Sequence, residues 1–224
     1  MYKDLFDEKK QMEMRDFFLN IAAPLGKTKT YFKNCEITLP ACPSVCIVTE
    51  GKVRVSLYGE KGLDKLLHFL IPGEIFGELN YFDNVEHNII VFAKEDTTIS
   101  IVSEEILTSL LKEHPEYYKY FIHSISRKYF LSLCHMSDIL FHSSISKVAN
   151  TLYRLTCLNS SCDEDKLTIP ISLTHQELGT LVGCSRITVT RILNTFKKEG
   201  IISSQNKTLI IHDLEKLKAY IEND

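Results

Sequence analysis

Residues 173–200 read LTHQELGTLVGCSRITVTRILNTFKKEG, and this stretch decides the fold of the C-terminal part of the 224-residue chain. Thr174, followed three residues later by Glu177, has the pattern of a capping box and predicts the start of a helix. Gly183 suits a left-handed backbone and predicts a turn, after which the Ser185 hydroxyl can cap a second helix. A helix, a short turn and a second helix in this order predict a helix-turn-helix.

The second predicted helix has one apolar and one polar face. Its apolar stripe has the i, i+3, i+4, i+7 spacing of a buried face: Val189, Ile192, Leu193 and Phe196. On the opposite face, an arginine can donate two hydrogen bonds to guanine O6 and N7, and Ile187 offers apolar contact, for example to a thymine methyl. Near the start of a recognition helix, such residues meet base edges in the major groove. We therefore predict four base contacts: Arg186, Ile187, Thr190 and Arg191.

Two features around this helix complete the pattern. Gly179 in the first helix predicts a close crossing of the two helices, because it has no side chain there. After Gly200 ends the second helix, residues 201–211 predict a hairpin, and Lys207 near its tip is placed to contact a DNA phosphate. A helical hairpin without a DNA role is the alternative, but the order and spacing of all these features favour DNA binding.

The N-terminal half has a different pattern, with short β-branched and aromatic runs separated by turn residues. Strands are predicted over residues 45–48, 52–58, 65–70 and 97–102. Several short strands at this spacing predict a small barrel or sandwich.

A long helix is predicted after Pro115, and it carries apolar residues in alternating steps of four and three. Such an a/d heptad seam is typical of a parallel two-stranded coiled coil. We therefore predict a dimer interface of seven residues: Tyr118, Ile122, Ile125, Tyr129, Ser132, Met136 and Ile139. The alternative is a helix that packs on its own domain, to which Leu131, Leu133 and Leu140 outside the seam could contribute.

Composition excludes several classes of protein. The longest apolar runs are too short to span a membrane, and the acidic first residues do not resemble a signal peptide, so we expect a cytoplasmic protein. The odd number of cysteines, seven, fits a reduced compartment better than a disulfide framework. Residues 143–212 carry three more positive than negative charges although the whole chain has a net charge of −3, which is compatible with DNA binding by this part. No nucleophile elbow, P-loop or Rossmann glycine motif is present, so the sequence does not indicate an enzyme.

Residues 173–193 closely resemble the helix-turn-helix signature of the bacterial Crp/Fnr transcriptional regulators. The resemblance extends to the turn glycines Gly51, Gly62 and Gly73 and to residues 76–79 (FGEL), which are similar to the cyclic-nucleotide-binding barrel. It implies an α+β fold with an effector-sensing β-roll (jelly-roll-like) domain over 1–112, a dimerisation helix over 113–142 and a winged helix-turn-helix domain over 143–224. Phe141 lies at the hinge implied between the last two.

The resemblance also implies partners and further contacts. By position, Gln176, Ser185 and Thr188 are similar to phosphate contacts of the family, and Lys207 joins them from the wing. Ile187 stands where a glutamate is common, so the operator should differ at that base pair. A Crp/Fnr homodimer would bind a palindromic operator in double-stranded DNA and recruit or block RNA polymerase.

The sensor pocket departs from the nucleotide-binding pattern. In nucleotide-binding members, an Arg-Ser pair after the Gly-Glu segment neutralises the cyclic phosphate, whereas His87 and Asn88 align there in this chain. A neutral histidine lacks the two-pronged cation of arginine, so we expect an effector other than cAMP. Ser132 gives up packing in the seam and is expected near the ligand. The predicted effector pocket has seven members: Gly77, Glu78, His87, Asn88, Tyr129, Ser132 and Leu133.

A redox or haem sensor is the alternative. Cys35, Cys42 and Cys46 lie close together in sequence, but no Cys-x-x-Cys pair supports an iron–sulfur cluster. Four histidines are candidate haem or metal ligands without a converging pattern: His68, His87, His123 and His135. The cofactor and the effector therefore stay open, as does a ligand-binding or redox module whose DNA binding is constitutive or vestigial.

Overall fold

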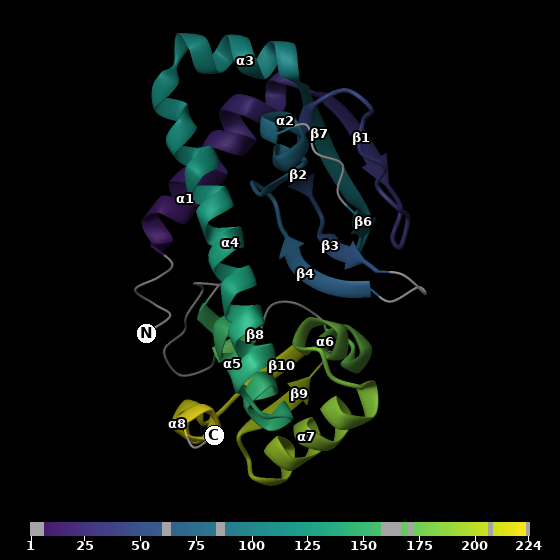
Figure 1. Cartoon of the computed structure of the whole chain (residues 1–224), viewed down its shortest axis with the longest axis vertical. Coiled ribbons are helices and arrows are strands. Elements are labelled where there is room, and N and C mark those ends of the chain that lie inside the picture. The colour runs from purple at the N-terminus through teal and green to yellow at the C-terminus, as the bar shows by residue number, and fades with distance from the viewer. Residues whose placement is uncertain are drawn as a thin grey trace. The chain divides into compact units, whose positions relative to one another are not determined.

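The structure, a computed structural model, describes residues 7–59, 64–83, 88–157, 167–169, 173–205 and 208–222 (Figure 1). The chain divides into two compact units, which meet in sequence between Tyr129 and Phe130. No helix in the described residues is long and apolar enough to cross a lipid bilayer.

The first unit is built from seven strands and the helices around them. Before the strands lies α1 (Glu8–Phe17), and among and after them lie α2 (Glu78–Asp83), α3 (Glu104–Glu113) and the start of α4 (Tyr118–Phe141). The strands are β1 (Lys27–Tyr31), β2 (Ser44–Glu50), β3 (Val53–Tyr58), β4 (Asp64–Leu70), β5 (Ile75–Phe76), β6 (Ile89–Ala93) and β7 (Thr97–Ser103).

These strands form two antiparallel sheets with the orders β1-β7-β2-β5 and β4-β3-β6. Their inward side chains meet in one apolar core, in which Val48 of β2 and Ile99 of β7 lie with Val53 of β3 and Val91 of β6. Alternation explains this arrangement, because Val53 and Val55 are buried while Arg54 between them is only half-buried. The unit is therefore a β-roll.

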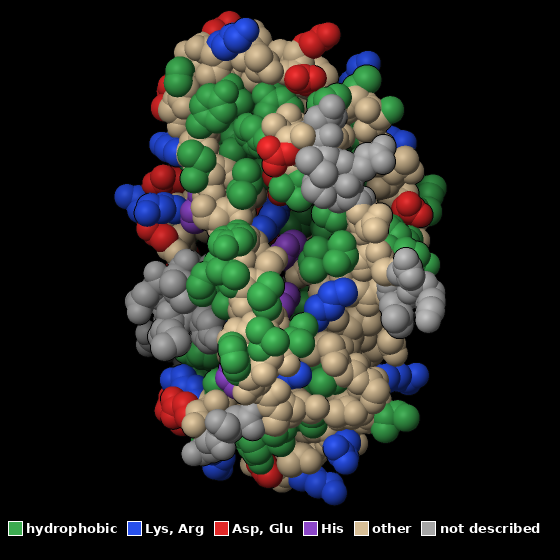
Figure 2. All heavy atoms as spheres, in the orientation of Figure 1, with side chains coloured by type: hydrophobic (Ala, Val, Ile, Leu, Met, Phe, Trp, Pro, Cys, Tyr) green, Lys and Arg blue, Asp and Glu red, His purple; other side chains and the backbone are tan. Residues whose placement is uncertain are grey.

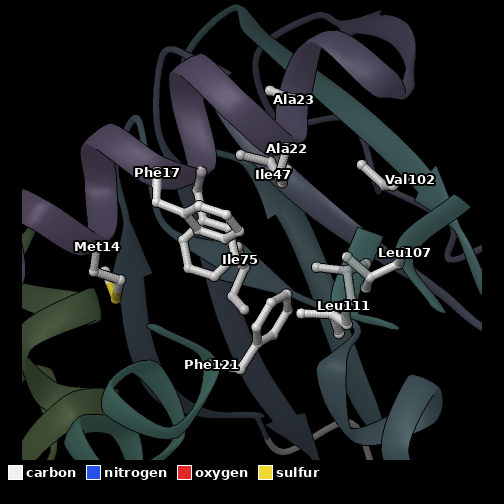
Figure 3. Close-up of a cluster of buried hydrophobic side chains, with 12 residues drawn as sticks. Met14, Phe17, Ala22, Ala23, Ile47, Ile75, Val102, Leu107, Leu111 and Phe121 are labelled. Atoms are coloured by element: carbon white, nitrogen blue, oxygen red, sulfur yellow. The ribbon is translucent and has the colours of Figure 1, made fainter. Parts of the chain in front are cut away.

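A second apolar cluster covers the outside of the roll (Figure 3). Phe17 at the end of α1 stacks on Tyr120 of α4 with ring centroids 4.6 Å apart, and Phe18 meets Phe121 edge to face at 5.0 Å. Leu107 and Leu111 of α3 join the same cluster. The cluster fixes the first turn of α4 against the roll.

The second unit contains the rest of α4 and a small helical domain with a three-stranded sheet. Its helices are α5 (Ser144–Cys157), α6 (His175–Val182), α7 (Arg186–Lys198) and α8 (Leu214–Glu222). The strands β8 (Leu167–Ile169), β9 (Ile202–Gln205) and β10 (Thr208–Ile211) form a sheet with the order β8-β10-β9. The expected α+β fold, with a β-roll, a long helix and a winged helix-turn-helix, is confirmed.

Candidate nucleic-acid interface and sensor site

The start of α6 has the predicted capping box. The Thr174 hydroxyl accepts a hydrogen bond from the Glu177 amide at 3.1 Å, and the Glu177 carboxylate accepts one from the Thr174 amide at 2.9 Å. Gly183 closes the helix in a left-handed conformation with φ of 71°, which a residue with a side chain adopts only under strain. The local sequence therefore fixes where the first helix begins and ends.

Gly179 is required for a reason that differs in detail from the expectation. A Cβ atom there would lie 2.7 Å from the carbonyl oxygen of Cys184, which is backbone of the turn and not part of the second helix. The Cys184 amide also donates to the Gly179 carbonyl at 2.9 Å. The glycine thus lets the turn fold back onto α6.

The recognition helix α7 begins at the predicted cap and buries the predicted stripe. The Ser185 hydroxyl accepts from the Thr188 amide at 3.1 Å. Val189, Ile192, Leu193 and Phe196 are buried, whereas the opposite face of α7 is open. That face borders a shallow concavity lined by seven residues: Arg186, Ile187, Thr190, Arg191, Asn194, Thr195 and Lys198.

All four predicted base contacts thus share one concave face. Among the described residues, the guanidinium groups of Arg186 and Arg191 form no hydrogen bond or ion pair within the chain. Ile187 is 82% exposed. Lys198 also lines this face but was not predicted, although it follows Arg191 by seven residues, two helical turns along.

The predicted phosphate contacts lie around this face. Gln176 is exposed in the first turn of α6, and Ser185 is exposed at the start of α7. Thr188 is half-buried, and its hydroxyl lies 2.9 Å from that of Ser185. Lys207 lies outside the described residues.

His175, the first residue of α6, contacts the recognition helix. Its Nδ1 lies 2.8 Å from the Thr190 hydroxyl, which donates to the Arg186 carbonyl at 2.8 Å. Because that hydroxyl has a single hydrogen, both hydrogen bonds form together only when His175 carries a proton on Nδ1 and donates to the hydroxyl. Burial and the positive charges of Lys197 and Arg186 lower the pKa of His175, which favours the neutral ring.

The sensor segment contains Gly77, which lies between β5 and α2, and Glu78, the first residue of α2. Gly77 has φ of 86°, and a Cβ atom there would lie 2.9 Å from the Ser44 carbonyl oxygen. Glu78 is buried, and its carboxylate accepts from the Lys128 ammonium of α4 at 2.6 Å. The same ammonium donates to the Ile75 carbonyl at 2.7 Å. The carboxylate expected to face a ligand therefore has a charged partner within the chain.

The other predicted pocket residues form no hydrogen bond or ion pair with Glu78 in the described part of the chain. Asn88 is exposed before β6, and its carbonyl accepts from the Tyr58 amide at 2.7 Å. Tyr129, Ser132 and Leu133 are exposed on α4. His87 lies outside the described residues. The residue of α4 that contacts Glu78 is Lys128, which precedes the predicted pocket residue Tyr129 by one position.

A second buried carboxylate, Glu74, lies at the other end of β5 and was not predicted. It accepts from Arg127 of α4 at 2.8 Å, and from Arg15 at 2.9 Å and Gln11 at 3.0 Å, both of α1. Burial alone would raise the pKa of Glu74, but the guanidinium groups of Arg127 and Arg15 outweigh it and hold the pKa below its usual value. Adjacent cations of α4 thus hold the carboxylates on both sides of β5.

The cysteines do not form a site in the described part of the chain. Cys35 and Cys42 are exposed and Cys46 is buried. Burial, with the nearby Glu78 charge, raises the pKa of Cys46 to about 12, so its thiol is protonated at neutral pH. No group of three or more His, Cys, Asp or Glu side chains among the described residues could hold a metal ion.

The predicted dimer seam lies on the open side of α4. Five seam residues are exposed large hydrophobics: Tyr118, Ile122, Tyr129, Met136 and Ile139. Ser132 is exposed and Ile125 half-buried. Leu133 and Leu140 are also exposed, whereas Leu131 is buried. In the alternative prediction all three leucines pack on the chain itself, and only Leu131 does so. Figure 2 shows hydrophobic side chains gathered along the helix.

The last turn of α4 is fastened to α5 by a buried polar cluster. Asp138 accepts hydrogen bonds from the Arg154 guanidinium and, at 2.7 Å, from the Asn150 amide. Arg154 is 2% exposed and also donates to the Thr151 hydroxyl at 3.2 Å. The cluster joins the predicted dimerisation helix to the first helix of the DNA-binding domain.

Comparison with known families agrees with both halves of this description. The family profile of the cyclic nucleotide-binding domain matches residues 40–114, and that of the Crp-like helix-turn-helix domain matches residues 146–220. Together the two profiles cover more than half of the chain. The chain belongs to the Crp/Fnr family.

Relatives of this Crp/Fnr protein are transcriptional regulators and not enzymes. The cAMP-activated global transcriptional regulator CRP of Salmonella typhimurium is 28% identical over 170 residues, which cover 74% of this chain and 79% of CRP. The CRP-like cAMP-activated regulator of Mycobacterium tuberculosis is 26% identical over 171 residues, 76% of either chain. The Crp/Fnr chain is therefore a DNA-binding transcriptional regulator with an effector-binding type of domain.

Solved structures show the same fold. A CooA variant from Carboxydothermus hydrogenoformans has a TM-score of 0.77 at 24% identity and covers 90% of both chains. A CRP/FNR family regulator from Thermus thermophilus has a TM-score of 0.67 at 25% identity, with 88% of this chain and 98% of that chain covered.

Proposed function

We propose that this regulator binds a palindromic DNA operator as a homodimer, with one α7 helix in the major groove of each half-site. The observation that carries the proposal is the concave face of α7, which combines two unengaged guanidinium groups with an exposed isoleucine. An arginine fork matches guanine O6 and N7, and these groups are accessible only in the major groove. Gln176, Ser185, Thr188 and Lys207 are the proposed phosphate contacts.

Dimerisation through α4 gives the operator its symmetry. The helix has 24 residues, is about 36 Å long, and carries the exposed seam along this length. Two parallel copies would present two α7 helices to half-sites whose centres are about one DNA turn apart. Bound in this way in the cytoplasm, the dimer would recruit or block RNA polymerase.

Lys128 suggests how the sensor controls DNA binding. A ligand that binds at Glu78 competes with the Lys128 ammonium for the carboxylate or contacts that ammonium through an anionic group, and neither charge can be left buried and unpaired without a large cost. Since Lys128 is a residue of α4, either event alters the dimerisation helix. A ligand shifts the equilibrium only as far as its affinities for the two arrangements differ.

The sensor segment argues against cAMP as the effector. The position of the phosphate-binding arginine falls on His87, and a ribose hydroxyl at Glu78 would compete with the Lys128 ammonium for the carboxylate. We expect isothermal titration calorimetry to show no micromolar affinity for cAMP, because losing a charge-assisted pair at a phosphate costs roughly two orders of magnitude or more. The cAMP-activated CRP of Salmonella typhimurium is the positive control. Micromolar binding by this chain would overturn the assignment.

Base reading by α7 is tested with a matched pair of variants on one face. Arg186→Ala is expected to cost about 1–3 kcal/mol on a selected operator and to leave binding to random DNA nearly unchanged. Lys198→Ala removes the same charge from the other end of the face, and is expected to weaken operator and random DNA alike and lower the salt slope by about 0.9. Fluorescence anisotropy over a salt series measures both. Equal operator affinity for Arg186→Ala and the wild type would refute the register of α7.

A further inference from the structure

Ile187 is the most exposed large hydrophobic side chain among the described residues, at 82%. It is the second residue of α7 and lines the concave face. A single exposed isoleucine is common on protein surfaces and shows nothing by itself. The residues beside it on the same face indicate that it belongs to a binding site.

Thr190 lies three residues after Ile187, on the same side of the helix. Its hydroxyl lies 2.8 Å from both the Arg186 carbonyl oxygen and His175 Nδ1, so its one hydrogen is used within the chain whichever of the two accepts it. The hydroxyl can therefore donate nothing to a base acceptor. Besides one remaining lone pair of the hydroxyl oxygen, Thr190 can offer a ligand only its γ-methyl group.

Two apolar groups thus lie between two cations. Arg186 precedes Ile187 directly, and Arg191 follows Thr190 directly. The major-groove edge carries one kind of apolar group, the C5-methyl of thymine, which 5-methylcytosine also has. Unmodified cytosine has only a hydrogen at C5 and so offers no methyl group to these two side chains.

We propose that Ile187 and the Thr190 γ-methyl form a methyl-reading site for a 5-methylpyrimidine, thymine or 5-methylcytosine, next to a guanine read by Arg186 or Arg191. His175 is a positioning residue in this site, because its hydrogen bond holds the Thr190 hydroxyl away from the DNA. The inference rests on the proposed DNA-binding function and specifies one base pair of each half-site.

The test starts from a duplex that the wild-type protein selects from a randomised double-stranded library. Without the effector, only a small fraction of the dimers need be competent to bind DNA. A small competent fraction lowers the apparent affinity but not the sequence preference, so selection at micromolar protein still enriches the specific site. Each thymine of the selected half-site is then replaced by deoxyuridine, which removes the methyl group alone. The ratio of the two dissociation constants is the methyl discrimination.

We expect one thymine at which the methyl discrimination is about three- to tenfold, the effect of one buried methyl group. A duplex with a 5-methylcytosine–guanine pair at that position should bind the protein at least threefold more tightly than a duplex with an unmodified cytosine–guanine pair there. Ile187→Ala and Thr190→Ser, which removes only the methyl of Thr190, should both bring the discrimination close to one. Thr195→Ser is the matched control, because the Thr195 hydroxyl also bonds the carbonyl four residues back but has no histidine partner.

His175 is tested through the same ratio. Asparagine has an amide donor near the position of Nδ1, so His175→Asn should keep the discrimination, while His175→Ala should lose it with the helix content unchanged. A selected site with uniform discrimination near one in the wild type would overturn methyl reading and leave specific DNA binding intact. A library in which no sequence is enriched would instead refute the proposed function itself.

Discussion

The double variant Ile122→Glu and Met136→Glu is expected to be a monomer at micromolar concentration, where the wild-type protein is a dimer. Both residues are exposed in the single chain and occupy equivalent seam positions two heptads apart. A dimer of the double variant would bury four unpaired carboxylates, each at an effective cost of several kcal/mol. Sedimentation velocity measures the change, and operator binding should be lost with the dimer.

The control for this variant is another exposed methionine. Met12 of α1 is 65% exposed, compared with 57% for Met136, and lies off the seam. Met12→Glu should leave the dimer and its DNA affinity unchanged. A double seam variant that sediments as the wild type does would place the interface on another surface.

Removing the Asp138 carboxylate is expected to destabilise the second unit by about 3–5 kcal/mol, because Arg154 would remain buried without that carboxylate. Asp138→Asn keeps the size and shape of the side chain and so limits the effect to the lost charge and the hydrogen bonds that need a carboxylate. The chain has no tryptophan, so urea unfolding is best followed by circular dichroism. Hydrogen exchange of α5 assigns the loss to this unit.

An exposed ion pair on α8 is the matched control. Glu215 is 83% exposed and pairs with Lys218 at 2.7 Å. Glu215→Ala should cost less than about 1 kcal/mol, as surface pairs do. If Asp138→Asn were equally mild, the join between α4 and α5 would not depend on this cluster.

Features that depend on local sequence could be predicted well. The capping box at Thr174, the left-handed Gly183 and the Ser185 cap each involve residues within a few positions of one another, and their chemistry permits few alternatives. The heptad spacing of α4 is likewise a property of one helix, and five of the seven predicted seam residues are exposed large hydrophobics, but their role as a dimer interface stays a prediction. The four strands predicted from β-branched runs lie in β2, β3, β4 and β7.

Features that depend on distant pairing were missed. Lys128 meets Glu78 across 50 residues, and Arg15 meets Glu74 across 59, so no sequence window contains both partners. The short strand β5 has two residues and carries no periodic signal of its own. In α7, spacing predicted which face is open, but it could not show that His175 of the neighbouring helix contacts the Thr190 hydroxyl.

We propose that α7 reads DNA sequence, and the most direct measurement of this is the ratio of affinities for a selected palindrome and a scrambled duplex of equal length and composition. Fluorescence anisotropy at physiological salt should give a ratio of at least about a thousand for the wild type, with half-sites about 10–10.5 base pairs apart. The Arg186→Ala variant should lose at least about fivefold of that ratio, since the lost contact is worth about 1–3 kcal/mol. Equal affinity of the wild type for the selected and the scrambled duplex would contradict the claim.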